Sequence, residues 1–131
     1  AYGYFHIGMR RPIYCTALGK VLTCKSPEVV SEVFKLGVTR YTLNTIVDEA
    51  EFLKEIEKVR LQGYGLDLEE WSSGINCIAA PIYDSNGDII AGISISGPTS
   101  MYPAEKIMEN VPVLIEYSHR ISARMGSRGG W

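Results

Sequence analysis

The sequence predicts an α+β domain that is built around one antiparallel β-hairpin. Three features support this prediction: alternating apolar segments on both sides of Asn86-Gly87, several helical stretches with clear start and stop signals, and a length of 131 residues. Asn-Gly is the strongest short hairpin signal, and a chain of this length forms one domain with one core. We therefore expect one domain over residues 1–126 and a frayed tail over residues 127–131.

The hairpin register separates small side chains from large apolar ones. A two-residue turn at Asn86-Gly87 places Cys77 opposite Ser96 and Ala79 opposite Ser94. A slip of one residue would mix the two faces, so the pattern supports this register. The apolar face then consists of Ile78, Ile82, Ile93 and Ile95.

The small-residue face of the hairpin has two interpretations. Cys77, Ser94 and Ser96 leave volume above the sheet, and the two serines offer hydroxyl groups roughly 7 Å apart along one strand. This arrangement suits a small polar ligand. Alternatively, the small side chains allow a helix to pack closely against this face, or the face is exposed to solvent. The pattern alone does not decide between these interpretations.

Capping residues, prolines and glycines indicate the helix boundaries. Thr16 is a candidate N-cap, and a helix that starts there would direct the backbone N–H groups of Ala17, Leu18 and Gly19 outward, where they attract carboxylates or phosphates. An ordinary capped helix is the alternative. The expected helices begin near residues 16, 26, 48 and 103, and Pro112 restarts or kinks the last one.

Two further strands are expected outside the hairpin. Residues 2–7 are partly aromatic and β-branched, and residues 64–69 alternate. The alternation directs Leu66 and Leu68 inward and Asp67 to the opposite side.

Composition and charge exclude several classes of protein. Apolar residues make up 46% and charged residues 21%, as in ordinary soluble domains. The net charge of −2 provides no basic surface, so this chain by itself is not expected to bind DNA. The longest apolar run, residues 89–95, is too short to span a membrane, and no signal peptide is visible. We expect a cytoplasmic protein without a membrane partner.

The cysteines favour neither disulfides nor a metal site. Cys15, Cys24 and Cys77 are an odd number without C-x-x-C spacing, and only His6 and His119 could add nitrogen ligands. Reduced cysteines, no metal and no cofactor are therefore expected.

Four segments match a known pattern in order and approximate spacing. They are residues 11–20 (RPIYCTALGK), 63–70 (GYGLDLEE), 74–82 (GINCIAAPI) and 93–98 (ISISGP). Together they resemble the effector-binding domain of IclR-type transcription regulators, from about Gly8 to Gly126. The resemblance implies a GAF-like antiparallel sheet with helices packed on its faces, and a pocket for a small organic acid or sugar acid.

The resemblance also implies which residues form the pocket. Backbone N–H groups at the start of the first helix would hold the ligand carboxylate, and side chains of the sheet would contact its carbonyl or hydroxyl groups. Leu18 is bulkier than the small residue of some family members, which would leave space around a very small acid or shift a larger one. The implied ligand-binding residues are Ala17, Leu18, Asp67, Cys77, Ser94 and Ser96.

The resemblance further implies a parent protein that is longer than this chain. Family members begin with a winged helix-turn-helix domain and a linker, and their effector domain starts before the equivalent of Tyr2. The parent would act as a homodimer or homotetramer and would contact operator DNA only through that N-terminal domain.

Two other functions remain as alternatives. Cys77 could be the nucleophile of an enzyme with His119 or His6 as its base, but a mid-strand cysteine lacks the usual means of lowering its pKa, so no enzymatic activity is expected. A pure oligomerisation module, associating through its helices, is the second alternative.

Overall fold

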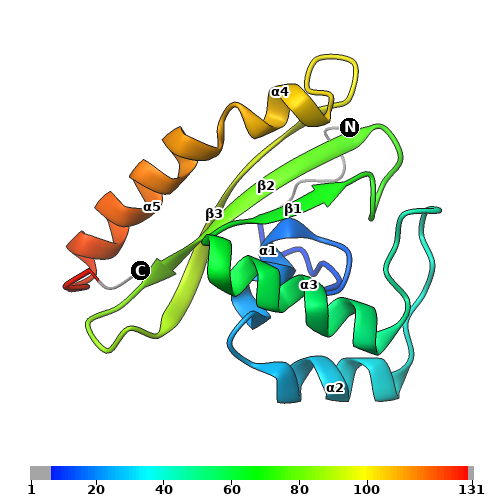
Figure 1. The fold of residues 1–131 in the computed structure, drawn as a ribbon, viewed down its shortest axis with the longest axis horizontal. Helices are drawn as coiled ribbons and strands as arrows, with labels where there is room; N and C mark the ends of the chain where they lie inside the picture. The colour runs from blue at the N-terminus through cyan, green and yellow to red at the C-terminus, as the bar shows by residue number, and fades with distance from the viewer. Residues whose placement is uncertain (1–6, 130–131) are drawn as a thin grey trace.

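The computed structural model describes residues 7–129, which form a three-stranded antiparallel sheet with helices on both faces (Figure 1). The predicted α+β class is confirmed. The strand expected over residues 2–7 lies outside the described residues, except for Ile7, and so do residues 130 and 131 of the expected tail. The strands, in their order across the sheet, are β1 (Gly65–Leu68), β2 (Ile75–Tyr83) and β3 (Ile89–Pro98).

Helices lie on both sides of the sheet. One face carries α1 (Ala17–Thr23), with α2 (Pro27–Leu36) and α3 (Glu49–Gln62) packed behind it, and the other face carries α4 (Ala104–Met108) and α5 (Val111–Arg124) (Figure 1). Within the described part of the chain, no helix is long and apolar enough to cross a membrane.

The hairpin has the predicted register but a longer turn. Cys77 lies opposite Ser96, as predicted. The N–H of Asp84 donates to the carbonyl oxygen of Asp88 at 3.0 Å, and Gly87 adopts a left-handed φ of 80°, so the loop has three residues instead of two. A β-bulge beside the turn absorbs the additional residue and restores the predicted pairing.

The side chain of Asp84 explains the longer turn. Its Oδ1 accepts N–H groups from Asn86 at 2.8 Å and from Asp88 at 3.0 Å. An aspartate that bonds to the backbone two residues later stabilises its own turn. This preference outweighs the two-residue turn that Asn86-Gly87 would otherwise form.

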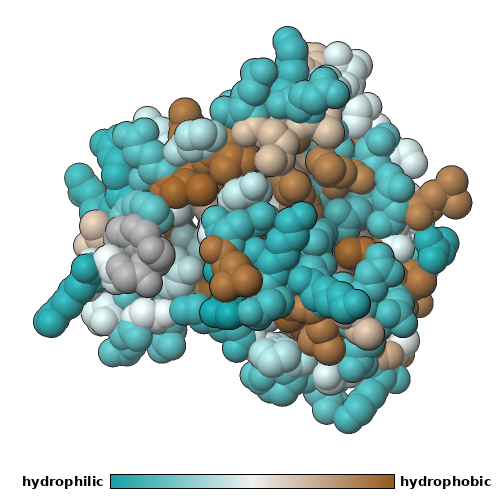
Figure 2. Space-filling view, viewed as in Figure 1, coloured by the Kyte–Doolittle hydropathy of each residue, from teal (hydrophilic) through white to brown (hydrophobic). Residues whose placement is uncertain are grey.

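Helix α3 begins at the predicted position and ends at a glycine. The side chain of Asp48 accepts the N–H of Glu51 at 2.9 Å, and Gly63 ends the helix in a left-handed conformation. Its charged face is exposed and forms a hydrophilic surface (Figure 2). Its buried residues are Phe52, Ile56 and Val59.

The sheet separates two apolar clusters. The cluster on the α4–α5 side includes Ile78 and Leu114, and the half-buried Leu66 and Leu68 pack against it. The other cluster joins α1, α2 and α3 to the sheet. Asp67 faces this second side and is only 6% exposed. The prediction that β1 directs its leucines and Asp67 to opposite sides is confirmed, and both sides are interior because helices cover both.

Helix α1 lies close to the sheet because two positions beneath it are glycines. A Cβ at Gly65 would lie 3.2 Å from the carbonyl oxygen of Ala17, and a Cβ at Gly92 would lie 2.7 Å from Cδ2 of Leu18. Gly65 pairs with Ala79, and Gly92 lies two residues before Ser94 on β3, so both glycines lie on the side of the sheet that carries the small residues. This part of that side therefore serves helix packing, which was one of the two interpretations.

Candidate functional site

A cavity of about 170 Å³ lies on the α1 side of the sheet, beyond the area that α1 covers. Side chains of β1, β2 and β3 border it from the sheet, and the start of α1 borders it from the opposite side. All six residues that were predicted to bind a ligand line this one cavity: Ala17, Leu18, Asp67, Cys77, Ser94 and Ser96. Their role in binding stays a prediction.

Five further residues line the cavity that the prediction did not include. They are Arg11, Thr16, Trp71, Ser72 and Ile75. The guanidinium carbon of Arg11 lies 4.0 Å from the ring centroid of Trp71, which is a cation–π contact. Both residues lie outside helices and strands, so no periodicity indicated their position. Their only signal was the location of each within or beside a segment of the family pattern.

Thr16 fixes the start of α1 at the cavity. Its hydroxyl oxygen accepts the N–H of Gly19 at 3.1 Å, which confirms the predicted N-cap, and the hydroxyl donates to the carbonyl oxygen of Pro12 at 2.6 Å. The N–H of Gly19 is therefore engaged, contrary to expectation. The N–H groups of Ala17 and Leu18 have no acceptor within the helix, as at any helix start.

Asp67 is a buried carboxyl group at the sheet side of the cavity. Its Oδ1 accepts the N–H of Glu70 at 2.8 Å. Burial raises the pKa of Asp67 to about 6; the hydrogen bond from Glu70 lowers it, and the carboxylate of Glu70 raises it further. Asp67 therefore changes its protonation state close to neutral pH and could either accept or donate a hydrogen bond.

We expect Asp67→Asn to stabilise the ligand-free domain more at high pH than at low pH. In the unfolded chain the carboxyl of Asp67 ionises near its ordinary pKa of 3.8, and in the folded chain it ionises near 6. Between these two pH values the folded state binds more protons than the unfolded state. The folded state therefore loses stability as the pH rises from about 3.8 to about 6. Across the whole window the difference is at most about 3 kcal/mol, and roughly half of it falls between pH 5 and pH 8. Urea unfolding at about pH 5 and about pH 8 measures the effect. An identical effect at both pH values would contradict this assignment.

The environment of Cys77 does not suit a nucleophile. The hydroxyl of Ser96 donates to Sγ of Cys77 at 3.1 Å. Burial raises the pKa of the thiol to about 11, although the bond from Ser96 opposes this rise. A thiol in this state is protonated at neutral pH and reacts slowly.

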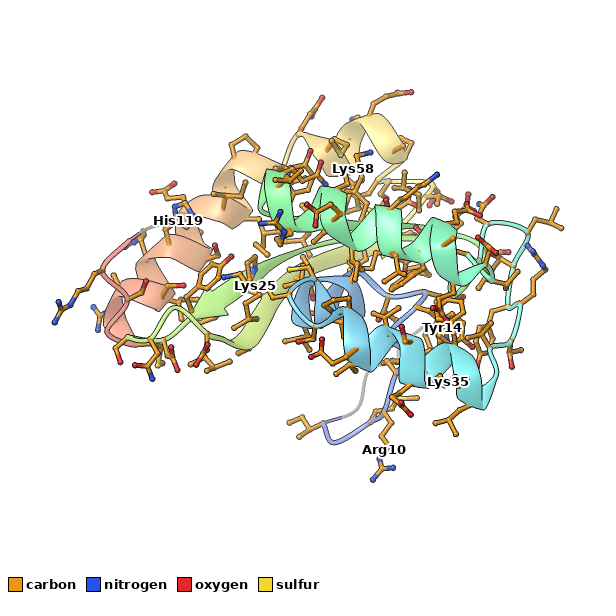
Figure 3. All side chains as sticks on the ribbon, turned by 60° about the horizontal axis from the view of Figure 1, so that its bottom comes forward. Arg10, Tyr14, Lys25, Lys35, Lys58 and His119 are labelled. Carbon is orange, nitrogen blue, oxygen red and sulfur yellow. The ribbon has the colours of Figure 1, made fainter. Side chains whose placement is uncertain are left out.

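His119, one of the two histidines considered as a base, does not lie beside Cys77. His119 belongs to α5, on the other face of the sheet, and lines a separate cavity with Gln62 and Tyr83 (Figure 3). His6 lies outside the described residues.

A buried lysine supports the wall of the cavity near Asp67. The side chain of Lys20 is fully buried, and its Nζ donates to Glu55 at 2.8 Å, to Glu70 at 2.9 Å and to the carbonyl oxygen of Leu66 at 2.7 Å. Burial raises the pKa of Glu70, while Lys20 lowers it. This Lys20 cluster connects α1, α3 and β1 and was not predicted from the sequence.

Comparison with known proteins identifies the family. The family model described as "Bacterial transcriptional regulator IclR C-terminal" matches residues 2–123. The chain belongs to this family. The resemblance stated from the sequence is thereby confirmed, and the chain is an effector-binding domain of the IclR type.

The curated relatives are named as transcription regulators. The HTH-type transcriptional regulator KdgR of Escherichia coli (strain K12) is 41% identical over 125 residues, which are 94% of this chain and 48% of KdgR. The chain spans about half the length of the curated relatives that it matches.

Solved IclR-family structures share the fold. The C-terminal domain of E. coli KdgR is 42% identical with a TM-score of 0.80, and the match covers 92% of this chain and 74% of that one. A double mutant of the PobR inducer-binding domain from Acinetobacter, in complex with 3-hydroxybenzoic acid, is 32% identical with a TM-score of 0.83, covering 89% of this chain and 71% of that one.

Proposed function

We propose that this IclR-type domain binds a small organic acid in the cavity beside α1, and that binding modulates the operator affinity of a helix-turn-helix domain in the same regulator. The observation that carries the proposal is the convergence of the six predicted residues on one cavity. Three of them, Cys77, Ser94 and Ser96, were placed on one face by the hairpin register alone.

The size of the cavity limits the ligand. Its volume is about 170 Å³, and an engineered cavity of about 150 Å³ in another protein holds one benzene molecule. A cavity of this volume has room for a ligand with a short carbon skeleton, or with one ring and a few polar substituents.

The residues that line the cavity suit a ligand with a carboxylate at one end and a hydroxyl or carbonyl group at the other. Leu18 and Ile75 contribute apolar surface for the carbon skeleton. Asp67 and the serines supply hydrogen-bonding groups, while the N–H groups at the start of α1 favour a carboxylate. The 3-hydroxybenzoic acid bound by the PobR domain is an acid of this kind.

We expect at least one compact acid to raise the melting temperature of the domain. The panel consists of 3-hydroxybenzoate, pyruvate, glycerate and gluconate. A ligand that binds only the folded state at about 100 times its Kd adds about 2.7 kcal/mol to the free energy of unfolding, which is a shift of several degrees. Calorimetric titration then gives the Kd and the stoichiometry. A folded domain that responds to no acid would contradict the proposal and would favour the oligomerisation module.

The regulatory half of the proposal requires the full-length regulator. An acid that stabilises the domain should change the affinity of the regulator for its operator, measured at one fixed salt concentration because salt alone changes that affinity strongly. An unchanged operator affinity would contradict the regulatory half of the proposal and would leave only the binding of the acid.

A further inference from the structure

Asp67 is held at the sheet side of the cavity by hydrogen bonds to it and to both of its neighbours in the chain. Its own Oδ1 accepts the N–H of Glu70 at 2.8 Å. The carbonyl oxygen of Leu66 accepts a hydrogen bond from Nζ of Lys20 at 2.7 Å, and the N–H of Leu68 donates to Oε2 of Glu70 at 3.3 Å. The buried carboxyl group of Asp67 therefore cannot turn outward to solvent without breaking this network.

The cations near Asp67 are committed to other groups. An ammonium group has three N–H donors. In Lys20 they are accepted by two glutamates and by the carbonyl oxygen of Leu66. Arg11 also lines the cavity, but its guanidinium packs against the ring of Trp71 and both of its terminal nitrogens are shielded from solvent. Neither side chain therefore directs its terminal N–H groups into the open volume of the cavity.

The charged and titratable side chains around Asp67 come from the elements packed against its face of β1. They are Glu70 in the turn after β1, Lys20 on α1, Cys77 on β2, Arg11 and Cys15 before α1, and Glu55 on α3. Burial raises the pKa of both thiols well above neutral pH, so the cysteines carry no charge. Together with Asp67 there are three carboxyl groups and two cations, so the ionised cluster is already negative before a ligand binds.

A bound carboxylate would add another negative charge to this cavity. The start of α1, which favours the ligand carboxylate, and Asp67 border the same space of about 170 Å³. When two carboxylates share one shielded site, the pKa of one of them is strongly raised. The ligand also displaces water from the cavity, and burial by itself disfavours the ionised form of a carboxyl group. Both effects favour a protonated Asp67 while the acid is bound.

Protonation also gives Asp67 a hydrogen bond to donate. An ionised carboxylate only accepts hydrogen bonds, whereas a protonated one has an O–H donor. The carbonyl oxygen of an oxo acid only accepts as well. On the sheet side of the cavity, the hydroxyl of Ser96 already donates to Sγ of Cys77 at 3.1 Å. A protonated Asp67 therefore supplies a donor that the ionised form lacks.

We propose that the acid binds together with one proton, which the carboxylate of Asp67 takes up from solvent, so that the domain binds the acid more tightly at low pH than at high pH. This inference rests on the proposed function and specifies the protonation state in which its cavity holds the acid.

The direction of the pH dependence follows from the two states of Asp67. In the ligand-free domain its pKa is about 6, and a bound anion raises this pKa further. Below pH 6 the proton is already present, and the affinity for the acid is constant there. Above pH 6 binding draws a proton from solvent, so the affinity falls as the pH rises, until the raised pKa is passed.

The test measures affinity and proton uptake together. Calorimetric titrations with 3-hydroxybenzoate and with pyruvate are performed on the unmodified domain, on Asp67→Asn and on Asp88→Asn. The unmodified domain should bind the acid about 10–100-fold more weakly at about pH 8 than at about pH 5.5. At about pH 7, titrations in two buffers of different ionisation enthalpy should show an uptake of about 0.4–1 proton per bound acid.

The two variants assign the proton to one residue. Asparagine keeps the shape of Asp67 and can donate and accept hydrogen bonds, but it cannot take up a proton. The affinity of Asp67→Asn should therefore change by less than about 3-fold between the two pH values, and at about pH 8 it should exceed that of the unmodified domain. Asp88→Asn removes an exposed carboxyl group beside the hairpin turn and should keep the full pH dependence.

The outcomes separate this inference from the proposed function. If the unmodified domain binds the acid equally well at both pH values and takes up no proton, this inference is refuted while the ligand site stands. If no acid of the wider panel binds at either pH, the proposed function fails and this inference fails with it. A persistent pH dependence in Asp67→Asn, or a loss of binding at both pH values, would also overturn the inference.

A direct titration of Asp67 decides the matter if Asp67→Asn does not fold. NMR of the carboxyl carbon of Asp67 gives its pKa in the unmodified domain, with and without a saturating concentration of 3-hydroxybenzoate. A higher pKa in the presence of the acid supports the inference, and an unchanged or lower one refutes it.

Discussion

Replacing Lys20 by methionine is expected to lower the free energy of unfolding by about 3–5 kcal/mol, the range measured when one partner of a buried ion pair is removed. Methionine fills much of the same volume, but it leaves the carboxylate of Glu70, whose side chain is only 10% exposed, without its cation. The carbonyl oxygen of Leu66 also loses its donor. Urea denaturation with linear extrapolation measures the change.

Lys35→Met is the matched control for this variant. Lys35 also pairs with a glutamate, Glu32, at 3.7 Å, but both side chains are 72% exposed, and Lys35 lies on the outer surface of α2 (Figure 3). An exposed pair of this kind contributes about 0–1 kcal/mol. Adding Glu70→Gln to Lys20→Met should recover part of the loss, because it removes the uncompensated charge. Equal, small losses in the two lysine variants would show that the Lys20 cluster does not stabilise the fold.

Replacing Ser94 or Ser96 by leucine is expected to weaken acid binding by at least about 100-fold, or roughly 2.7 kcal/mol. Each leucine would occupy volume that the ligand needs and would remove a hydroxyl group from the sheet side of the cavity. Both serines are exposed and line the cavity, so the larger side chain should fit without disturbing either apolar cluster. Calorimetric titration with the strongest binder of the acid panel measures the loss.

Ser100→Leu provides the control for the two serine variants. Ser100 is exposed in the turn after β3 and does not line the cavity. Its substitution should leave the affinity unchanged within about 3-fold. Affinities in Ser94→Leu and Ser96→Leu as high as in this control would place the ligand outside the cavity.

Local signals in the sequence were sufficient for most of the secondary structure. Thr16, Asp48 and Gly63 mark helix ends because capping depends on residues within one turn of the helix. The register of β2 and β3 followed from alternation, since a slip of one residue would have moved apolar side chains to the cavity face. The family resemblance depended in the same way on short segments and their order, and the family match confirmed it.

The turn shows where local reasoning becomes insufficient. Asn86-Gly87 favours a two-residue loop, whereas the side chain of Asp84 favours a longer one by accepting two backbone N–H groups. Both preferences are readable in the sequence, but they compete. Only the folded hairpin, with its bulge, shows which arrangement has the lower free energy.

By itself, the sequence determined the fold class, the strand register and the face that carries Cys77 and the two serines, because these depend on neighbours along the chain. The tertiary structure decided how that face is divided between the packing of α1 and a cavity. It also decided that Arg11 meets Trp71 and that Lys20 meets Glu70, which is 50 positions away. Such contacts leave no periodic pattern, since they depend on how the loops and helices pack after the sheet has formed.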